Sequence, residues 1–410
     1  MLIWIKCPNA NFETQRLELL METTVIFWDE FISNDRELFE SVLRFFSKYR
    51  IQKKFIFVCS GDFRQILPVV RFGIKADIIK SCISSSPYYA DFRVRFLKKN
   101  MRLQGLEKEL PDDCTEEQRS HIEKQIQYAQ FLMDLSCNKS GPSLNILEVI
   151  DEDTYKIGLP NMSYFTTEQE KDAISWLYPN KEFNPEIALS TVILSSTNVA
   201  VDKWNSIIQD MNKSETRIYE ARDSFEEVDD ENHILSSILT KEIMSSYNKN
   251  GVPTHDLKFK LNDVCIVLRA MKILGLATNT RVKIVKLGKY NVRVKTLNEP
   301  KERYVFIPRI TFKFRLDYGE SYQLTRVQIP LRLAYSMTYN KSQSQSYEKV
   351  LIDATGEPFA HGHGYTAFSR GRDCVKVKMF IKEEQLHPKG DSSHDMIPCI
   401  TNIVYKDILI

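Results

Sequence analysis

Acidic side chains follow two short apolar runs of the chain, and their types suit the hydrolysis of a nucleotide. Asp29 and Glu30 come directly after the run at residues 25–28, and Asp62 comes shortly after a second run at residues 55–58. In nucleotide hydrolases an aspartate in such a place helps to hold Mg²⁺, and a neighbouring glutamate polarises the attacking water. Many strands end in acids, so the pair alone also fits an ordinary strand end.

The residues around Asp62 form a more specific pattern. Residues 61–70 are GDFRQILPVV, a polar cluster held by an apolar stretch that contains a proline. An amide such as Gln65 could sense a γ-phosphate there and relay its presence toward DNA. A turn and loop without a catalytic role is the alternative, and the segment by itself leaves both open.

The two apolar runs predict strands that are buried on both faces of a parallel sheet. Between them, apolar residues recur at helical spacing: Leu38, Phe39, Val42, Leu43, Phe46 and Tyr49. A strand, a helix and a strand in this order form a βαβ unit. We therefore expect both acidic clusters at one edge of a sheet, where the carboxyl ends of parallel strands meet.

A second α/β region is expected from about residue 94, with a buried strand at residues 191–194 and a helix from about 199 to 211. The acidic residues 215–231 indicate a solvated linker or loop. Short alternating strands between about 258 and 315 predict a small inserted β-barrel. The α/β pattern returns from 334 to about 380, and the last thirty residues show no interpretable pattern.

In combination, these motifs resemble those of the PIF-type superfamily 1 DNA helicases, and most of all the helicase part of Helitron transposases. Trp28-Asp29-Glu30 and the GDFRQILP segment are similar to two motifs of that family. Further matches follow in the same order along the chain: residues 99–103 (KNMRL), 196–205, 251–257 (GVPTHDL), 268–269, 275–281, 337–346 (MTYNKSQSQS) and 365–370 (YTAFSR).

The resemblance implies an α/β fold with two RecA-like motor domains of the P-loop NTPase type, the first of them truncated, and a small inserted β-barrel. The expected boundaries are 1–95 for the C-terminal part of the first RecA-like domain and 236–329 for the barrel region, which binds DNA. The second RecA-like domain takes 96–235 and 330–385, and 386–410 is a tail.

The resemblance also implies ATP and Mg²⁺ as cofactors and single-stranded and forked DNA as partners. It assigns catalysis to Asp29, Glu30, Gln65, Arg102 and Arg370, with Asp29 as the metal ligand. It assigns nucleotide binding to Gly61, Asp62, Gln343 and Ser344, and DNA binding to Thr338, Asn340, Lys341 and Ser342. A finger arginine stabilises charge on a transferring phosphoryl group. Without the motif context, a surface ion pair is the alternative for either arginine.

Residues 281–315 hold eleven Lys and Arg against two acids, with aromatic residues between them. Basic strands with aromatics suit a track for single-stranded DNA, and Lys283, Lys286 and Arg293 are its candidate residues. An amphipathic barrel with solvated lysines is the alternative, and the pattern leaves both open.

Three features depart from the family pattern, and one of them is Phe31-Ile32, which stands where the family has small residues or proline. A phosphate-binding loop of the form GxxxxGK(S/T) occurs nowhere in the sequence, so we expect the chain alone to be impaired in ATP hydrolysis. Ser344 stands where the family has glycine, and a Cβ is harmful there if the backbone needs positive φ. The hypotheses are therefore an N-terminally incomplete 5′→3′ DNA helicase and an inactive, transposon-derived remnant that only binds single-stranded DNA.

Composition sets broader limits. With 43% hydrophobic and 27% charged residues, the chain is expected to fold, and its net charge of +2 provides no overall basic field. No apolar run approaches the roughly 20 residues of a membrane helix, and no signal peptide is recognisable. Eight cysteines without a CxxC pair indicate reduced thiols. We expect an intracellular protein, located in the nucleus, without a membrane partner.

Overall fold

The computed structural model describes residues 22–48, 56–70, 72–97, 100–101, 103, 115–179, 183–227, 241–297, 302–315, 322–389 and 392–409. The chain divides into two compact units. Unit 1 comprises residues 1–164, 342–346 and 354–410, and unit 2 comprises residues 165–341 and 347–353. In the described part of the chain, no helix is long and apolar enough to cross a membrane.

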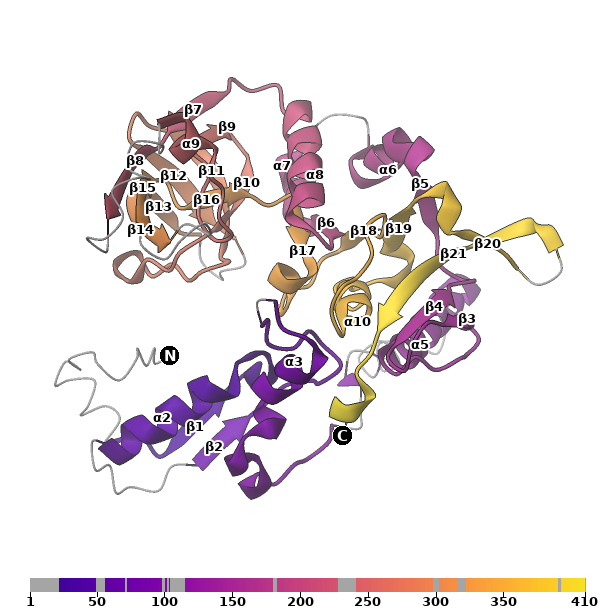
Figure 1. Ribbon diagram of the computed structural model, residues 1–410. Helices are drawn as coiled ribbons and strands as arrows, with labels where there is room; N and C mark the ends of the chain where they lie inside the picture. The colour runs from indigo at the N-terminus through magenta and orange to yellow at the C-terminus, as the bar shows by residue number, and fades with distance from the viewer. Residues whose placement is uncertain are drawn as a thin grey trace. The chain divides into compact units, whose positions relative to one another are not determined.

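The first part of unit 1 is the expected βαβ unit. β1 (Val25–Trp28) and β2 (Ile56–Cys59) pair in parallel, with α2 (Arg36–Lys48) between them in the chain. The helix lies along one face of the two strands (Figure 1). Phe39 of α2 is buried there against Trp28 and Phe57, one inward-facing residue from each strand.

The expectation that these two strands are buried on both faces is wrong. Phe27 is 78% exposed and Ile56 is 57% exposed, because the side chains of a strand alternate and only the other face packs on α2.

The rest of unit 1 is built from helices and an antiparallel sheet. The helices are α3 (Lys75–Ser81), α5 (Glu116–Ser136) and α10 (His363–Phe368), and β19 (Val377–Ile381) follows α10. The sheet has the strand order β20-β21-β4-β3, formed by β20 (Leu386–Lys389), β21 (Ser392–Ile403), β4 (Thr154–Gly158) and β3 (Asn145–Val149). The C-terminal residues, which show no pattern in the sequence, thus form two strands of a sheet.

Unit 2 contains a parallel α/β layer. β6 (Thr191–Ser195) lies between β17 (Ser336–Thr338) and β18 (Lys349–Asp353) and pairs in parallel with both. Every residue of β6 is buried, as its continuous apolar sequence predicted. The helices of this part are α6 (Glu170–Leu177), α7 (Pro185–Ser190) and α8 (Asn198–Met211), and α8 confirms the expected helix. β5 (Tyr164–Thr166) lies where the chain passes from unit 1 to unit 2.

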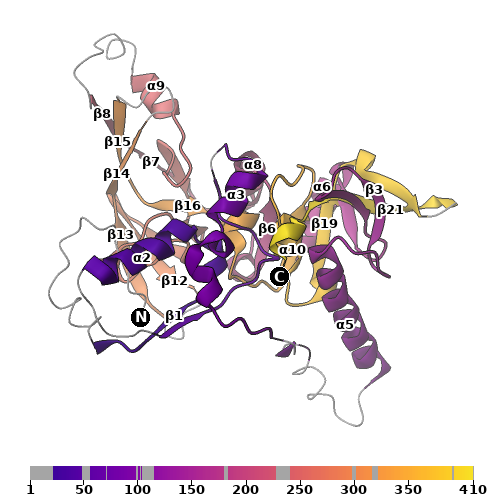
Figure 2. The same cartoon turned by 60° about the horizontal axis from the view of Figure 1, so that its bottom comes forward.

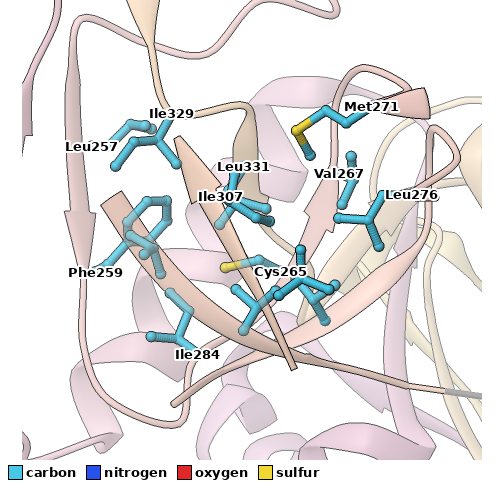
Figure 3. Packing of buried hydrophobic residues seen from close by; sticks show 14 of the residues in the cluster. Leu257, Phe259, Cys265, Val267, Met271, Leu276, Ile284, Ile307, Ile329 and Leu331 are labelled. Atoms are coloured by element: carbon cyan, nitrogen blue, oxygen red, sulfur yellow. The ribbon is translucent and has the colours of Figure 1, made fainter. Parts of the chain in front are cut away.

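The antiparallel part of unit 2 begins with a five-stranded sheet in the order β13-β12-β11-β10-β16. Its strands are β10 (Val264–Val267), β11 (Arg281–Leu287), β12 (Asn291–Thr296), β13 (Tyr304–Pro308) and β16 (Leu331–Leu333). Valine, isoleucine and leucine side chains from these strands fill one core, with Cys265 and Met271 among them (Figure 3). The expected short strands are therefore confirmed, and their closure into a barrel stays a prediction.

Two smaller sheets complete unit 2, and they correct the expected acidic linker. β14 (Ile310–Arg315), β15 (Tyr322–Gln328) and β8 (Arg222–Glu227) form one sheet, and β7 (Arg217–Glu220) and β9 (Asp256–Phe259) form the other. Figure 2 shows α9 (Lys241–Ser246) near β8 and β15. Residues 217–227 are strands despite their acidity, because a surface strand needs few inward apolar side chains. Tyr219, which is 1% exposed, supplies one.

Candidate functional site

The two acids after β1 are fixed by the neighbouring strand end, within unit 1. Oδ1 of Asp29 accepts hydrogen bonds from Oγ of Ser60 at 2.5 Å and from the backbone N–H of Glu30 at 3.0 Å. Ser60 follows β2 directly, so the parallel pairing brings it to Asp29. The backbone of Glu30 is left-handed, with φ of 51°. This turn places its carboxylate beyond the strand end.

A segment more than 300 residues further along the chain reaches Glu30. Oγ of Ser344 donates a hydrogen bond to Oε1 of Glu30 at 2.7 Å. The neighbouring Gln343 donates from Nε2 to the carbonyl oxygen of Ile66 at 3.2 Å. Ser344 has φ of 60°, which is the left-handed conformation that glycine adopts most easily. The structure thus brings Glu30, Gln343 and Ser344 together and gives a reason why glycine suits position 344.

Asp62 lies in a tight polar cluster. Arg64 donates to its carboxylate from Nε at 2.7 Å and from Nη2 at 3.0 Å, and the hydroxyl of Tyr365 donates to it at 3.0 Å. The Arg64 guanidinium also lies 5.4 Å from the centre of the Tyr365 ring. Burial, reinforced by the charge of Asp62, raises the pKa of Tyr365 to about 12, so its hydroxyl stays a donor at neutral pH. Asp62 therefore connects residues 62–64 to α10.

The loop that carries Gln65 packs closely on residues 361–362. A Cβ on Gly362, which has φ of 74°, would lie 2.6 Å from the carbonyl oxygen of Arg64. His361 donates from Nε2 to the Phe63 carbonyl at 2.7 Å and accepts the Tyr405 N–H at Nδ1 at 2.8 Å. Burial lowers the pKa of His361, which favours this neutral tautomer. Within the described residues, Oε1 of Gln65 is buried and has no hydrogen-bond partner.

Arg370 lies next to the segment that contacts Glu30. Its guanidinium donates to the carbonyl oxygens of Thr366 at 2.9 Å and Gln345 at 3.2 Å, and to Oγ of Ser369 at 2.8 Å. Gln345 follows Ser344, so one peptide unit separates the Arg370 contact from the Glu30 contact. The second candidate finger, Arg102, lies outside the described residues.

The predicted DNA-binding residues of positions 338–342 are divided between the two units. Thr338, Asn340 and Lys341 belong to unit 2, and Ser342 is fully buried in unit 1. Burial, with repulsion from Arg332, lowers the pKa of Lys341 to about 8.

The predicted basic track differs among its three residues. Lys283 forms an ion pair with Glu186 at 2.9 Å, whereas Lys286 and Arg293 are exposed.

Three residues of the site were not identified from the sequence. Ser60 binds Asp29, Tyr365 binds Asp62, and Gly362 permits the close approach to residues 64–65. A hydroxyl directly after the second strand and the glycine between two histidines were the available signals. Neither shows which distant residue it contacts.

Comparison with known proteins agrees with the motif analysis. Residues 5–134 match the family model described as PIF1-like helicase. Over 112 residues the chain is 30% identical to the ATP-dependent DNA helicase PIF1 of Emericella nidulans. That alignment covers 27% of this chain and 14% of the relative, so the chain matches a small part of that protein's length.

Two solved structures are similar over most of the chain. The crystal structure of the Pif1 helicase from Candida albicans covers 96% of this chain and 77% of its own, with a TM-score of 0.55 and 17% identity. The crystal structure of Bacteroides Pif1 bound to single-stranded DNA covers 93% of this chain and 76% of its own, with a TM-score of 0.58 and 17% identity.

The chain therefore has a mixed α/β fold with parallel sheets that is similar to the fold of the Pif1 helicase structures. The resemblance to PIF-type helicases that the motifs predicted is confirmed, with the family match spanning residues 5–134. The closer likeness to Helitron enzymes stays a prediction.

Proposed function

We propose that this chain carries most of the motor of an ATP-dependent 5′→3′ DNA helicase of the PIF and Helitron type. That helicase would couple ATP hydrolysis to movement along single-stranded DNA and to duplex unwinding. The observation that carries the proposal is the cluster of Asp29, Glu30 and Ser344, with Arg370 bonded to the next residue, Gln345. These residue types are what phosphoryl transfer to water needs: a metal ligand, a water-polarising base and a cation.

Each side chain has a distinct role in this proposal. Asp29 is exposed, and its carboxylate beside the Ser60 hydroxyl is an oxygen donor set that fits Mg²⁺. When bound, Mg²⁺ supplies charge neutralisation on the phosphates. Glu30 accepts a proton from the attacking water. Gln65 is the proposed sensor of the γ-phosphate, to which its side-chain amide N–H would donate, while its unpartnered amide oxygen would accept a hydrogen bond from the attacking water.

Arg370 and Arg102 are the proposed fingers, while Gly61, Asp62, Gln343 and Ser344 shape the nucleotide site. Three of the five N–H donors of the Arg370 guanidinium bond protein oxygens, and one of these is the carbonyl of Gln345. A phosphate bound by Arg370 would therefore be linked through Gln345 to the position of residues 344–345.

The proposed DNA contacts are Thr338, Asn340, Lys341 and Ser342, together with Lys286, Arg293 and, less strongly, the ion-paired Lys283. We propose single-stranded and forked DNA as the partners, the nucleus as the location, and the domain division given by the motifs: 1–95, 96–235 with 330–385, 236–329 and 386–410.

A second function, binding of single-stranded DNA without catalysis, is favoured by two observations. The sequence contains no GxxxxGK(S/T) loop, which supplies the amides and the lysine that hold the phosphates. Ser344 also holds a left-handed backbone without being glycine. On these grounds we propose that the 410-residue chain alone hydrolyses ATP no faster than background.

Two measurements distinguish the functions: the sequence of the transcript, and the activity of the protein that it encodes. The 5′ end of the transcript is sequenced, and the encoded protein is assayed for ATP hydrolysis with Mg²⁺ and single-stranded DNA and for unwinding of a fork with a 5′ tail. If the protein is a helicase, DNA stimulates its ATP hydrolysis, and the Glu30→Gln variant loses this hydrolysis. The rate of hydrolysis falls at least a hundredfold in the Arg370→Ala variant.

The outcomes separate the claims. Hydrolysis by the 410-residue chain that disappears in its own Glu30→Gln variant would contradict the proposed impairment. A transcript product that carries the loop and binds DNA, yet shows no hydrolysis, would contradict the helicase proposal and support the binding function.

A further inference from the structure

The five-stranded sheet of unit 2 has an outer face that differs from its core. Along β12 and β13, Val292, Val294, Val305 and Ile307 point into the apolar core, where Ile307 is labelled in Figure 3. The alternate residues point outward. Among them Tyr304 is 47% exposed and Phe306 is 54% exposed, and Arg293 is also exposed. Two aromatic rings and an arginine therefore share one solvent-facing surface.

Strand register places these three side chains together. Arg293 lies directly opposite Phe306 on the neighbouring strand. Its guanidinium carbon is 5.1 Å from the centre of the Tyr304 ring and 5.5 Å from that of Phe306. Both distances are within the range of a cation–π interaction. Arg293 thus orders the two rings on a rigid sheet without burying them.

Charge on this face is concentrated in one row across the strands. Lys286 lies opposite Arg293, which lies opposite Phe306. In the adjacent row Lys283 and Lys295 are neutralised by ion pairs with Glu186 and Glu302. In the described ranges of the chain, no ion pair with a carboxylate is recorded for Lys286 or Arg293. Arg293 therefore contacts both exposed rings, and Lys286 lies beyond it on the next strand.

The spacing of the rings suits an unstacked polymer of aromatic bases. Tyr304 and Phe306 are two residues apart on β13, so their Cα atoms are about 6.6 Å apart. This is about twice the 3.4 Å rise per nucleotide of a duplex strand. Two successive bases can each meet one ring only if the strand is extended and its bases are unpaired.

We propose that Lys286, Arg293, Tyr304 and Phe306 form a base-stacking platform for two successive nucleotides of single-stranded DNA. Tyr304 and Phe306 each stack a base, and Lys286 and Arg293 contact the phosphates beside them. The proposal rests on the proposed function and deepens it, because phosphate contacts alone do not distinguish a single strand from a duplex.

The test measures binding of the full chain to a fluorescein-labelled oligothymidine of twenty nucleotides and to a duplex of the same length. Tyr304→Leu and Phe306→Leu keep an apolar side chain and remove the aromatic ring. We expect each to weaken single-strand binding about tenfold and to leave duplex binding unchanged, since stacking contributes roughly 1–3 kcal/mol per base. Tyr290→Leu is the matched control, because Tyr290 is 60% exposed but lies outside the platform.

Salt dependence tests the cations separately. Lys286→Ala and Arg293→Ala should each lower the log–log slope of affinity against salt by about 0.7 for a single strand. Lys295→Ala is the control and should leave the slope nearly unchanged, because Lys295 is paired with Glu302 and is not a proposed DNA contact. The leucine variants should leave the slope intact. Thermal melting confirms that each variant is folded.

Several outcomes overturn the platform. Wild-type affinity in the Tyr304→Leu/Phe306→Leu double variant overturns it and leaves the helicase proposal standing. An equal loss of affinity for the single strand and for the duplex also overturns it, because the rings would then not be stacking on unpaired bases. A folded chain that binds no single-stranded DNA at all overturns both proposals.

Discussion

In the candidate site, Ser344 has a backbone conformation that is unfavourable for its residue type. Its φ of 60° is uncommon for a residue with a Cβ, and its hydroxyl holds Oε1 of Glu30 at 2.7 Å. The serine therefore adds one interaction with the proposed catalytic base and retains backbone strain. Glycine at this position would have neither.

Two substitutions of Ser344 separate the strain from the hydrogen bond. Ser344→Ala loses the bond and keeps the strained Cβ, whereas Ser344→Gly loses both. A left-handed backbone costs a residue with a Cβ about 1–2 kcal/mol, and glycine gives back part of this through its freedom in the unfolded chain. We expect the glycine variant to be more stable than the alanine variant by about 1 kcal/mol in urea unfolding. Equal stability of the two would show that the backbone is unstrained.

Glu30→Ala provides the control for the hydrogen bond, because it removes the acceptor oxygen. If Ser344 stabilises the folded chain through Glu30, then Ser344→Ala costs less in the Glu30→Ala background than in the wild type. An identical cost in both backgrounds would show that the serine acts through another contact.

Among the elements, β8 and β15 are joined by a buried ion pair that also fixes residues 244–255. Arg326 on β15 is fully buried and binds Asp223 on β8 through Nε at 2.9 Å and Nη2 at 2.8 Å. It also donates to the carbonyl oxygens of Met244 at 2.8 Å and Pro253 at 3.1 Å. His255 binds the same carboxylate at 2.9 Å.

Removing one partner of this pair should destabilise unit 2 strongly. Arg326→Met leaves Asp223 buried without its cation, and breaking a buried pair in this way costs about 3–5 kcal/mol. Combining Arg326→Met with Asp223→Leu removes both charges and should recover most of that loss. Urea unfolding at pH 7 measures both variants. A double variant that is no more stable than the single one would show that the carbonyl contacts, and not the unpaired charge, set the cost.

The same pair predicts a pH dependence. Burial opposes ionisation of Asp223, but hydrogen bonds from Arg326 and His255 outweigh it and lower its pKa below 3.8. An acid whose pKa is lowered by folding stabilises the native state above its unfolded pKa, and this stabilisation is lost as the pH falls through the folded value. Wild-type stability should therefore decline below about pH 4. Arg326→Met should instead gain stability on acidification, because its buried carboxyl becomes neutral.

Elements with a continuous apolar sequence could be predicted, while those with a single inward residue could not. Apolar runs and helical spacing in the sequence predict β1, β2, β6 and α8. This works because the side chains of these elements make mostly apolar contacts, which do not depend on one particular partner residue. β7 and β8 were missed because their outward residues are charged and only Tyr219 marks the buried side of β7. Contacts such as Asp62 with Tyr365 join residues 303 apart, and no local pattern encodes that pairing.

At the scale of the molecule, the C-terminal residues are an integral part of unit 1. β21 pairs with β4 over five residues, from Cys399 opposite Gly158 to Ile403 opposite Thr154. Nδ2 of Asn402 donates to the carbonyl of Leu135 at 2.8 Å. Beyond β21, Tyr405 and Ile408 pack in one apolar cluster with Leu67 and Cys82. The segment therefore supports the loop that carries Asp62 and Gln65.

Deleting residues 386–410 should consequently unfold unit 1. If these residues were only a tail, the same deletion would leave unit 1 folded. The deletion removes two strands, and burial of a large apolar side chain such as Ile408 contributes about 1.5–3 kcal/mol by itself. Hydrogen exchange measured by mass spectrometry should show lost protection in β1, β2 and β4, with protection kept in β10–β12.

Single substitutions test the same idea with less disruption. Ile408→Ala, at a residue 2% exposed, should cost about 2–5 kcal/mol. Met396→Ala on the same segment, at a residue 37% exposed, should cost much less. Because Ile408 packs with Leu67, two residues beyond Gln65, its loss should also raise exchange in residues 61–67. Native protection of that loop in a folded Ile408→Ala variant would show that the C-terminal segment does not hold the candidate site in place.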